Sequence, residues 1–151
     1  MKVVNPKVHE TLRDHYMILP HCQALGLKYE GIEADEAIVL SLPWQAAFNG
    51  PDGAMHGGPL ATLVDVACAI AVTAWLPQFE ALATLDMRLD FLRPVQPNKP
   101  VFAKAVCEPV TGMIAYVKAE CYQEGEAEPV VLCTAAFIRS PLPRAILEAL
   151  V

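Results

Sequence analysis

The feature that most constrains this chain is the segment 57–76, in which Asp65 is the only charged residue. Such a run is long enough to cross a bilayer as a helix. A charge near its middle is costly in lipid, however, and no Lys or Arg occurs between Lys28 and Arg88 to flank it. A helix that is apolar on every side is otherwise one enclosed by its own protein. We therefore expect a long buried helix here rather than a membrane span.

The segments around this helix alternate between apolar and polar residues, which is typical of half-buried strands. In the clearest case, residues 84–91, we place Leu85, Met87, Leu89 and Phe91 on one face and Thr84, Asp86, Arg88 and Asp90 on the other. Further strands are expected at residues 25–32, 37–42, 101–108, 114–122 and 130–138, and short helices at residues 5–17 and 144–150. This order is not a βαβ repetition, so the fold class is α+β with a largely antiparallel sheet. Only a strongly curved sheet can cover a helix that is apolar on all sides.

Composition indicates one folded domain that associates with copies of itself. The chain has 151 residues, of which 54% are hydrophobic and 19% charged, too apolar for a disordered chain. Lys and Arg number 11 against 17 Asp and Glu, a net charge of −6 that argues against non-specific nucleic-acid binding. The apolar excess favours a homo-oligomer, since a small domain often hides such surface in an interface.

Cysteine and histidine spacing predicts neither a disulfide framework nor a metal site. Five cysteines form an odd set without a C-x-x-C pair, and the four histidines form no H-x-x-x-H or H-x-H pair. The first ten residues contain no apolar run of the kind that a secretory signal needs. We therefore expect a cytoplasmic protein with reduced thiols and no metal site.

The strongest chemical signal is His56-Gly57-Gly58-Pro59 at the start of the buried helix, with Asp65 inside it. A glycine-rich helix start presents unpaired N–H groups, and the helix dipole adds partial positive charge there, which together suit an anion or an oxyanion. Asp65 has no cationic neighbour one turn away, and an unpartnered buried carboxylate is costly. Each feature has a structural alternative. The Gly-Gly pair can simply form a tight turn into the helix, and the Asp65 side chain can hydrogen-bond a backbone group of a neighbouring strand. Their coincidence favours an active site.

Other side chains near this helix have simpler interpretations. His56 is expected to anchor the loop or position a substrate rather than act as a general base. We interpret Cys68 as a core residue rather than a nucleophile. Asn49 is a turn residue unless the loop folds back over the helix start.

The stretch 49–139 resembles the hotdog-fold acyl-CoA thioesterases, specifically the phenylacetyl-CoA (PaaI-like) branch. The resemblance is carried by N…HGG…AT-L-V-D from Asn49 to Asp65, by T-L-D-M-R-L-D-F-L-R-P from Thr84 to Pro94, and by C-T-A-A-F from Cys133. It implies a sheet wrapped around one long central helix, dimers or tetramers, and hydrolysis of acyl-CoA thioesters without a cofactor. We expect one such domain over residues 1–151, with a lead-in at 1–24 and a short extension at 140–151.

The resemblance also assigns roles to individual residues. Gly57 matches the oxyanion donor and Asp65 the catalytic carboxylate, while His56 and Asn49 match positions that shape the thioester site. Asn49 stands one residue farther from HGG than in some members. Thr84 falls where a Ser or Thr helps to hold the water. Gly58 is a further candidate substrate-binding residue. Apart from the resemblance, Arg88, Arg93 and Lys104 are candidates for binding the CoA phosphates, and the alternative for each is an ordinary solvated charge.

The spacing of Gly57 and Asp65 predicts a site shared between two subunits. Eight residues of helix separate them by about 12 Å, so both cannot contact one reacting carbon. A two-fold dimer with antiparallel central helices would bring Gly57 of one subunit to Asp65 of the other. Together with this geometry, the resemblance implies a thioesterase in which Asp65 acts as general base or as nucleophile. The alternatives are a non-catalytic acyl-CoA-binding or regulatory module of the same fold, and a hotdog hydratase or dehydratase.

Overall fold

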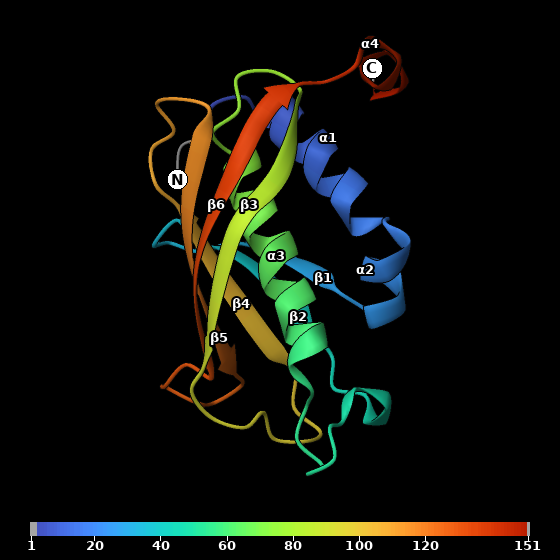
Figure 1. Ribbon diagram of the computed structural model, residues 1–151, viewed down its shortest axis with the longest axis vertical. Helices are drawn as coiled ribbons and strands as arrows, with labels where there is room; N and C mark the ends of the chain where they lie inside the picture. Colours follow the sequence, from blue (N-terminus) through green and yellow to red (C-terminus); the bar gives the residue numbers. More distant parts are fainter. Residues whose placement is uncertain (1–2, 151) are drawn as a thin grey trace.

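The computed structural model describes residues 3–150, and a single six-stranded antiparallel sheet forms its framework (Figure 1). The strands are β1 (Lys28–Ile32), β2 (Ile38–Leu42), β3 (Glu80–Phe91), β4 (Val101–Cys107), β5 (Ile114–Gln123) and β6 (Val131–Pro141). They are ordered β1-β2-β4-β5-β6-β3, so β3 lies at one edge. Helix α3 (Gly57–Thr73) packs along the inner face of this curved sheet. The structure thus confirms the predicted α+β hotdog fold with one long central helix.

The sheet does not enclose α3 alone. Helix α1 (Pro6–Met17) packs on the side that the sheet leaves open, as Figure 1 shows. Buried His9 of α1 ties the two helices together, with 2.8 Å between its Nδ1 and Thr73 Oγ1. The expectation that a curved sheet by itself would cover the helix was therefore incomplete.

Several element boundaries differ from those predicted; β3, for example, begins at Glu80 rather than at residue 84. The strand expected from residue 25 begins at Lys28, because Pro20 opens a short helix, α2 (Pro20–Leu25), that the alternation pattern does not predict. Gly26 ends this helix in the left-handed region, with φ of 73°, where glycine is favoured. The central helix ends at Thr73 rather than at residue 76. The predicted terminal helices are present, as α1 and α4 (Arg144–Leu150).

Strand β3 contains a bulge that changes which of its residues face the helix. The pairing with β6 shifts between Thr84 and Asp86, so Leu85 is an extra residue and is 52% exposed. Directly opposed residues share a face of the sheet, and Thr84 opposes the buried Phe137. Thr84 therefore lies on the inner face of the sheet. The prediction that placed it on the other face, with Asp86, was wrong.

No helix within residues 3–150 is both long and apolar enough to span a membrane. This includes α3, the segment whose composition raised that alternative.

A nearly buried ion pair joins the far end of β3 to β6. Arg139 Nε and Nη2 each donate to a carboxylate oxygen of Glu80 at 2.7 Å, and the two side chains are 18% and 7% exposed. Hydrogen bonding from Arg139 lowers the pKa of Glu80. The stabilisation is therefore fully present above the pKa of an unfolded glutamate, and it is lost as pH falls through the lowered folded-state pKa.

We expect Arg139→Met to lower the free energy of unfolding by about 3 kcal/mol at neutral pH, because it leaves Glu80 nearly buried without its partner. The loss should shrink in acid, where Glu80 is protonated. Denaturant unfolding at several pH values measures both effects. Arg144→Met is the control, since its pair with Glu148 is solvent-exposed and should contribute little. Equal effects of the two substitutions would contradict the prediction.

Candidate active site

The start of α3 leaves one backbone donor open. His56 is the N-cap, and its Nδ1 accepts from the Gly58 N–H at 3.0 Å. Pro59 has no N–H to offer. Among residues 3–150, no group accepts a hydrogen bond from the Gly57 N–H. The helix dipole places partial positive charge at this donor, so the geometry suits a carbonyl oxygen that gains negative charge.

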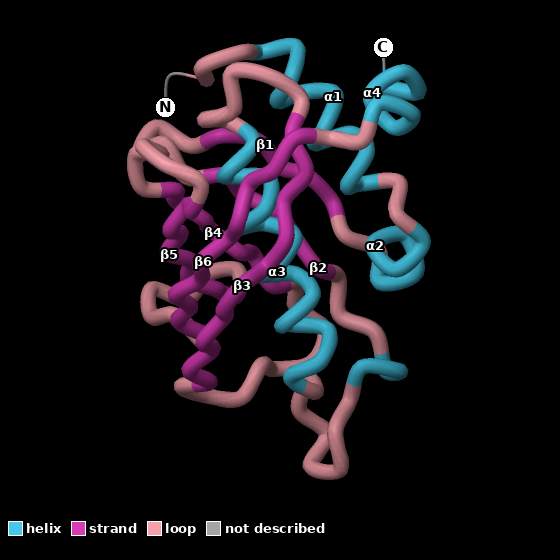
Figure 2. The backbone as a smooth tube through the Cα atoms, turned by 45° about the horizontal axis from the view of Figure 1, so that its top comes forward, coloured by secondary structure: helices cyan, strands magenta, loops and turns pink. Residues whose placement is uncertain are grey.

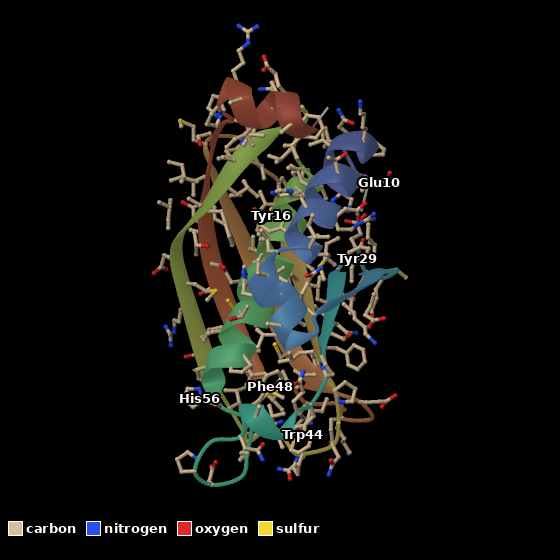
Figure 3. All side chains as sticks on the ribbon, turned by 90° about the vertical axis from the view of Figure 1, so that its right-hand side faces the viewer. Glu10, Tyr16, Tyr29, Trp44, Phe48 and His56 are labelled. Carbon is tan, nitrogen blue, oxygen red and sulfur yellow. The ribbon has the colours of Figure 1, made fainter. Side chains whose placement is uncertain are left out.

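The loop before α3 folds back toward the helix start (Figure 2). Asn49, which follows the short helix η1 (Ala46–Phe48), forms an antiparallel bridge with Met55. The His56 N–H donates to the Phe48 carbonyl at 2.6 Å, and Figure 3 shows both residues at the same end of α3. Exposed Asn49 is thus brought beside the helix start, although 49–56 is a loop. This is the fold-back on which a role for Asn49 depends.

A groove of about 850 Å³ lies beside this helix start. Its apolar wall is formed by Met55, Leu60, Phe91, Leu92, Pro94 and Val95, and His56, Asp52 and Arg93 add polar groups. The groove is therefore suited to an apolar chain with a polar end. Phe91 and Leu92 close the β3 side of this groove, a role that the alternation pattern did not assign to them.

Asp65 lies farther along α3 and has a partner. It is half-buried, and Thr84 Oγ1 donates to its Oδ1 at 2.7 Å. The expectation of an unpartnered buried carboxylate was therefore wrong. The bulge at Leu85 turns Thr84 toward α3, and this contact joins two residues that the resemblance alone had linked to one water.

The N-terminal helices bring two further titratable side chains within electrostatic reach of Asp65, which sequence reasoning missed. Burial and then the charge of Asp65 raise the pKa of Tyr16, on α1, to about 12. Figure 3 shows Tyr16 on the stretch of α1 that crosses α3. Cys22, on α2, has its pKa raised by the same two causes. No pattern in the sequence connects residues 16 and 22 with residue 65.

Cys68 is placed as the sequence predicts, in the core. It is fully buried, and a hydrogen bond with Cys133, followed by burial, raises the pKa of its thiol well above the ordinary value. A thiol that resists ionisation is a poor nucleophile. This agrees with the structural interpretation of Cys68.

The three cationic candidates do not gather in one place. Arg93 lines the groove and pairs with Glu128 at 2.7 Å. Arg88 lies on the outer face of β3, where it pairs with Asp90 at 3.2 Å, and Lys104 pairs with Glu33 at 2.8 Å on the outer face of β4. The structure therefore brings only Arg93 to the helix start.

Within one chain, the open donor and the carboxylate are two separate places. Both lie on the uninterrupted helix α3, so about 12 Å of helix separates Gly57 from Asp65. The first adjoins Phe91, near the end of β3, and the second adjoins Thr84, nearer its middle.

Comparisons with known proteins agree with this fold and identify a family. A sequence model of the Thioesterase superfamily matches residues 52–130, which include the start of α3, Asp65 and Thr84. A curated protein of Halobacterium salinarum, provisionally named an esterase, is 34% identical over 79 residues. That match spans 46% of this chain and 52% of the Halobacterium protein.

Solved structures extend the similarity to most of the chain. A Pseudomonas aeruginosa protein is 36% identical, with a TM-score of 0.76, over 89% of this chain and 100% of that one. The phenylacetic acid degradation protein PaaI of Thermus thermophilus is 30% identical, with a TM-score of 0.70, over 81% of this chain and 100% of that one. The chain therefore belongs to the Thioesterase superfamily. Within it, the PaaI-like branch of hotdog proteins is the one that it resembles.

Proposed function

We propose that this protein hydrolyses an acyl-CoA or related acyl thioester. Water adds to the thioester carbonyl carbon, the carbon–sulfur bond breaks, and the products are a carboxylic acid and a free thiol. The observation that carries the proposal is the open Gly57 N–H at the start of α3, beside an apolar groove. Superfamily membership supports the same reaction class.

The helix start supplies the part of the site that polarises the thioester carbonyl. The Gly57 N–H donates to the thioester carbonyl oxygen and stabilises the oxyanion that forms. Because His56 Nδ1 accepts from Gly58, the proton of the neutral ring lies on Nε2. Nε2–H is then a second donor for the substrate, and Asn49 shapes the same end of the site. Gly58 contributes its small size, since a side chain there would crowd the His56 ring at 3.3 Å.

Asp65 supplies the hydrolytic half. Thr84 Oγ1 donates a hydrogen bond to Oδ1 of the carboxylate, so Oδ2 remains free to accept from a water. The Thr84 hydroxyl oxygen keeps lone pairs that accept from the same water. As general base, Asp65 removes a proton from the water that adds to the carbonyl carbon, and this proton leaves with the thiol. As nucleophile, Asp65 attacks the carbonyl carbon itself, the thiolate leaves, and water then hydrolyses the acyl–Asp65 anhydride.

The two halves are proposed to meet across a two-fold dimer interface. Strand β3 is an edge strand, and such an edge is available to pair with another chain. Exposed apolar Leu85, Phe91 and Leu92 lie along or next to it. Antiparallel pairing of two β3 strands reverses one against the other, which carries the Asp65–Thr84 pair toward the partner's Phe91 and Gly57. A tetramer would join two such dimers.

The two ends of the acyl-CoA substrate are assigned to different parts of the protein by their polarity and charge. The acyl group enters the apolar groove, and the CoA phosphates contact cationic side chains. Arg93 is best placed for this, at the groove, while Arg88 and Lys104 reach a phosphate only if the bound CoA passes over the outer face of the sheet. We also propose that residues 1–151 act as one domain and that the protein works in the cytoplasm.

A panel of alkyl and aryl acyl-CoAs, assayed by release of free thiol, tests the proposed reaction. The name of the Thermus relative makes an arylacetyl thioester a sensible member of the panel. We expect thiol release with at least one member. Binding without thiol release would favour the acyl-CoA-binding module, and a hydrated or dehydrated product that retains its thioester would favour the hydratase alternative.

We expect Thr84→Val to lower kcat by roughly tenfold, because it removes the hydroxyl that holds Asp65 and its water. Thr84→Ser should restore most of the activity. Thr134→Val, at an exposed position on the outer face of β6, is the matched control. Steady-state thiol release measures all three variants. If Thr84→Val were as active as the parent, Thr84 would have no part in positioning the water.

A further inference from the structure

The ring of Phe91 stands directly over Gly57. An ideal Cβ added to Gly57 would lie 3.0 Å from Phe91 Cζ and 3.2 Å from Cε1. Carbon atoms normally approach no closer than about 3.5 Å. The space between the ring and this helix start therefore has no room for one additional methyl group.

Phe91 is nevertheless not a core residue. Its side chain is 54% exposed, and it forms part of the wall of the groove beside the open Gly57 N–H. Aromatic rings that pack in a core are normally covered. The ring is therefore part of the surface, at the end of β3 and against a glycine, where a substrate in the groove and a partner chain paired with β3 would both contact it.

We propose that Phe91 sets the width of the acyl pocket, so that the protein selects thioesters whose carbon next to the carbonyl is unbranched. The inference rests on the proposed function. A carbonyl oxygen bound to Gly57 N–H lies about 2.9 Å from that nitrogen, which is one bond from Gly57 Cα. The acyl carbon next to the carbonyl then lies within reach of the Phe91 ring. A methylene fits there, and a branch meets the ring.

Butyryl-CoA and isobutyryl-CoA test this selection, because they have equal carbon number and differ only in the branch. We expect the parent to favour butyryl-CoA in kcat/KM by roughly tenfold or more. Phe91→Ala should bring the ratio close to one, mainly through faster hydrolysis of isobutyryl-CoA. Tyr116→Ala is the matched control, since Tyr116 is a similarly exposed aromatic residue (58%) on β5, outside the groove. A ratio that Phe91→Ala leaves unchanged overturns the proposal.

The contact with Gly57 provides a second test in the same assay. Gly57→Ala keeps the N–H but adds the methyl that the ring opposes. The fold should survive, because the ring tip belongs to a half-exposed side chain that can move. The loss of butyryl-CoA hydrolysis caused by Gly57→Ala should be several-fold smaller in the Phe91→Ala background than in the parent. Equal losses in both backgrounds would mean that the ring does not limit this space.

Binding separates this inference from the proposed function. Ketone analogues of the two substrates, with the sulfur replaced by a methylene, cannot be hydrolysed, and calorimetry measures their Kd values. We expect the same preference for the unbranched analogue, and its loss in Phe91→Ala. If that dependence holds while no acyl-CoA is hydrolysed, the proposed reaction is wrong and the assignment of Phe91 stands. Equal Kd values for both analogues in the parent overturn the assignment of Phe91.

Discussion

Asp65→Asn should lower kcat for thioester hydrolysis by roughly 10²-fold or more and leave the protein folded. Asparagine has nearly the shape of aspartate, and its amide oxygen can still accept from Thr84 Oγ1, so the contact between α3 and β3 is retained. It has no carboxylate to deprotonate a water or attack a carbonyl. Thiol release under saturating substrate measures the change.

Asp86→Asn is the matched control for this substitution. Asp86 is an exposed carboxylate on the same strand as Thr84, but it opposes Ala136 on the outer face of the sheet. It should keep parental turnover. Near-parental turnover of Asp65→Asn would show that Asp65 is a structural partner of Thr84 and that the proposed mechanism is wrong.

A hybrid dimer of Gly57→Pro and Asp65→Ala chains should recover activity that neither variant has by itself. Gly57 is the first residue of α3, where the proline backbone is tolerated, so Gly57→Pro removes the N–H donor. The proline ring must displace Phe91 and can disturb the loop, so circular dichroism checks that the variant is folded. If each site takes its donor from one chain and its carboxylate from the other, one site of the hybrid carries both defects and the other none. The isolated hybrid should have about half of the parental activity, and a random mixture about a quarter.

The reverse arrangement is the control for this hybrid. A parental chain paired with a chain that carries both substitutions would have one defect in each shared site and should be inactive. Differently tagged chains allow both hybrids to be isolated, and light scattering at assay concentration checks that they are dimers or tetramers. An active reverse hybrid beside an inactive first hybrid would place both groups within one chain. An active monomer would contradict the shared site altogether.

The features of this protein that depend on local pattern could be predicted from its residues alone. Asn5 before Pro6 predicts the start of α1, where Asn5 Oδ1 accepts from the Val8 N–H. The glycine-rich entry at residues 56–59 locates the start of α3, and the near absence of charge in this segment predicts its burial. These features involve residues within a few positions of each other, so a single sequence contains the signal.

Which distant side chains contact each other depends on the packing of the whole fold. Thr84 and Leu85 are both compatible with a strand, so nothing local shows that Leu85 is the extra residue of a bulge. One such residue turns Thr84 from the outer face to the inner one, because side chains alternate along a strand. The Thr84–Asp65 hydrogen bond across 19 positions and the contact of Phe91 with Gly57 both depend on how β3 packs beside α3. These contacts depend on how distant segments pair and pack. The hydrophobic pattern of either segment alone is compatible with several different pairings.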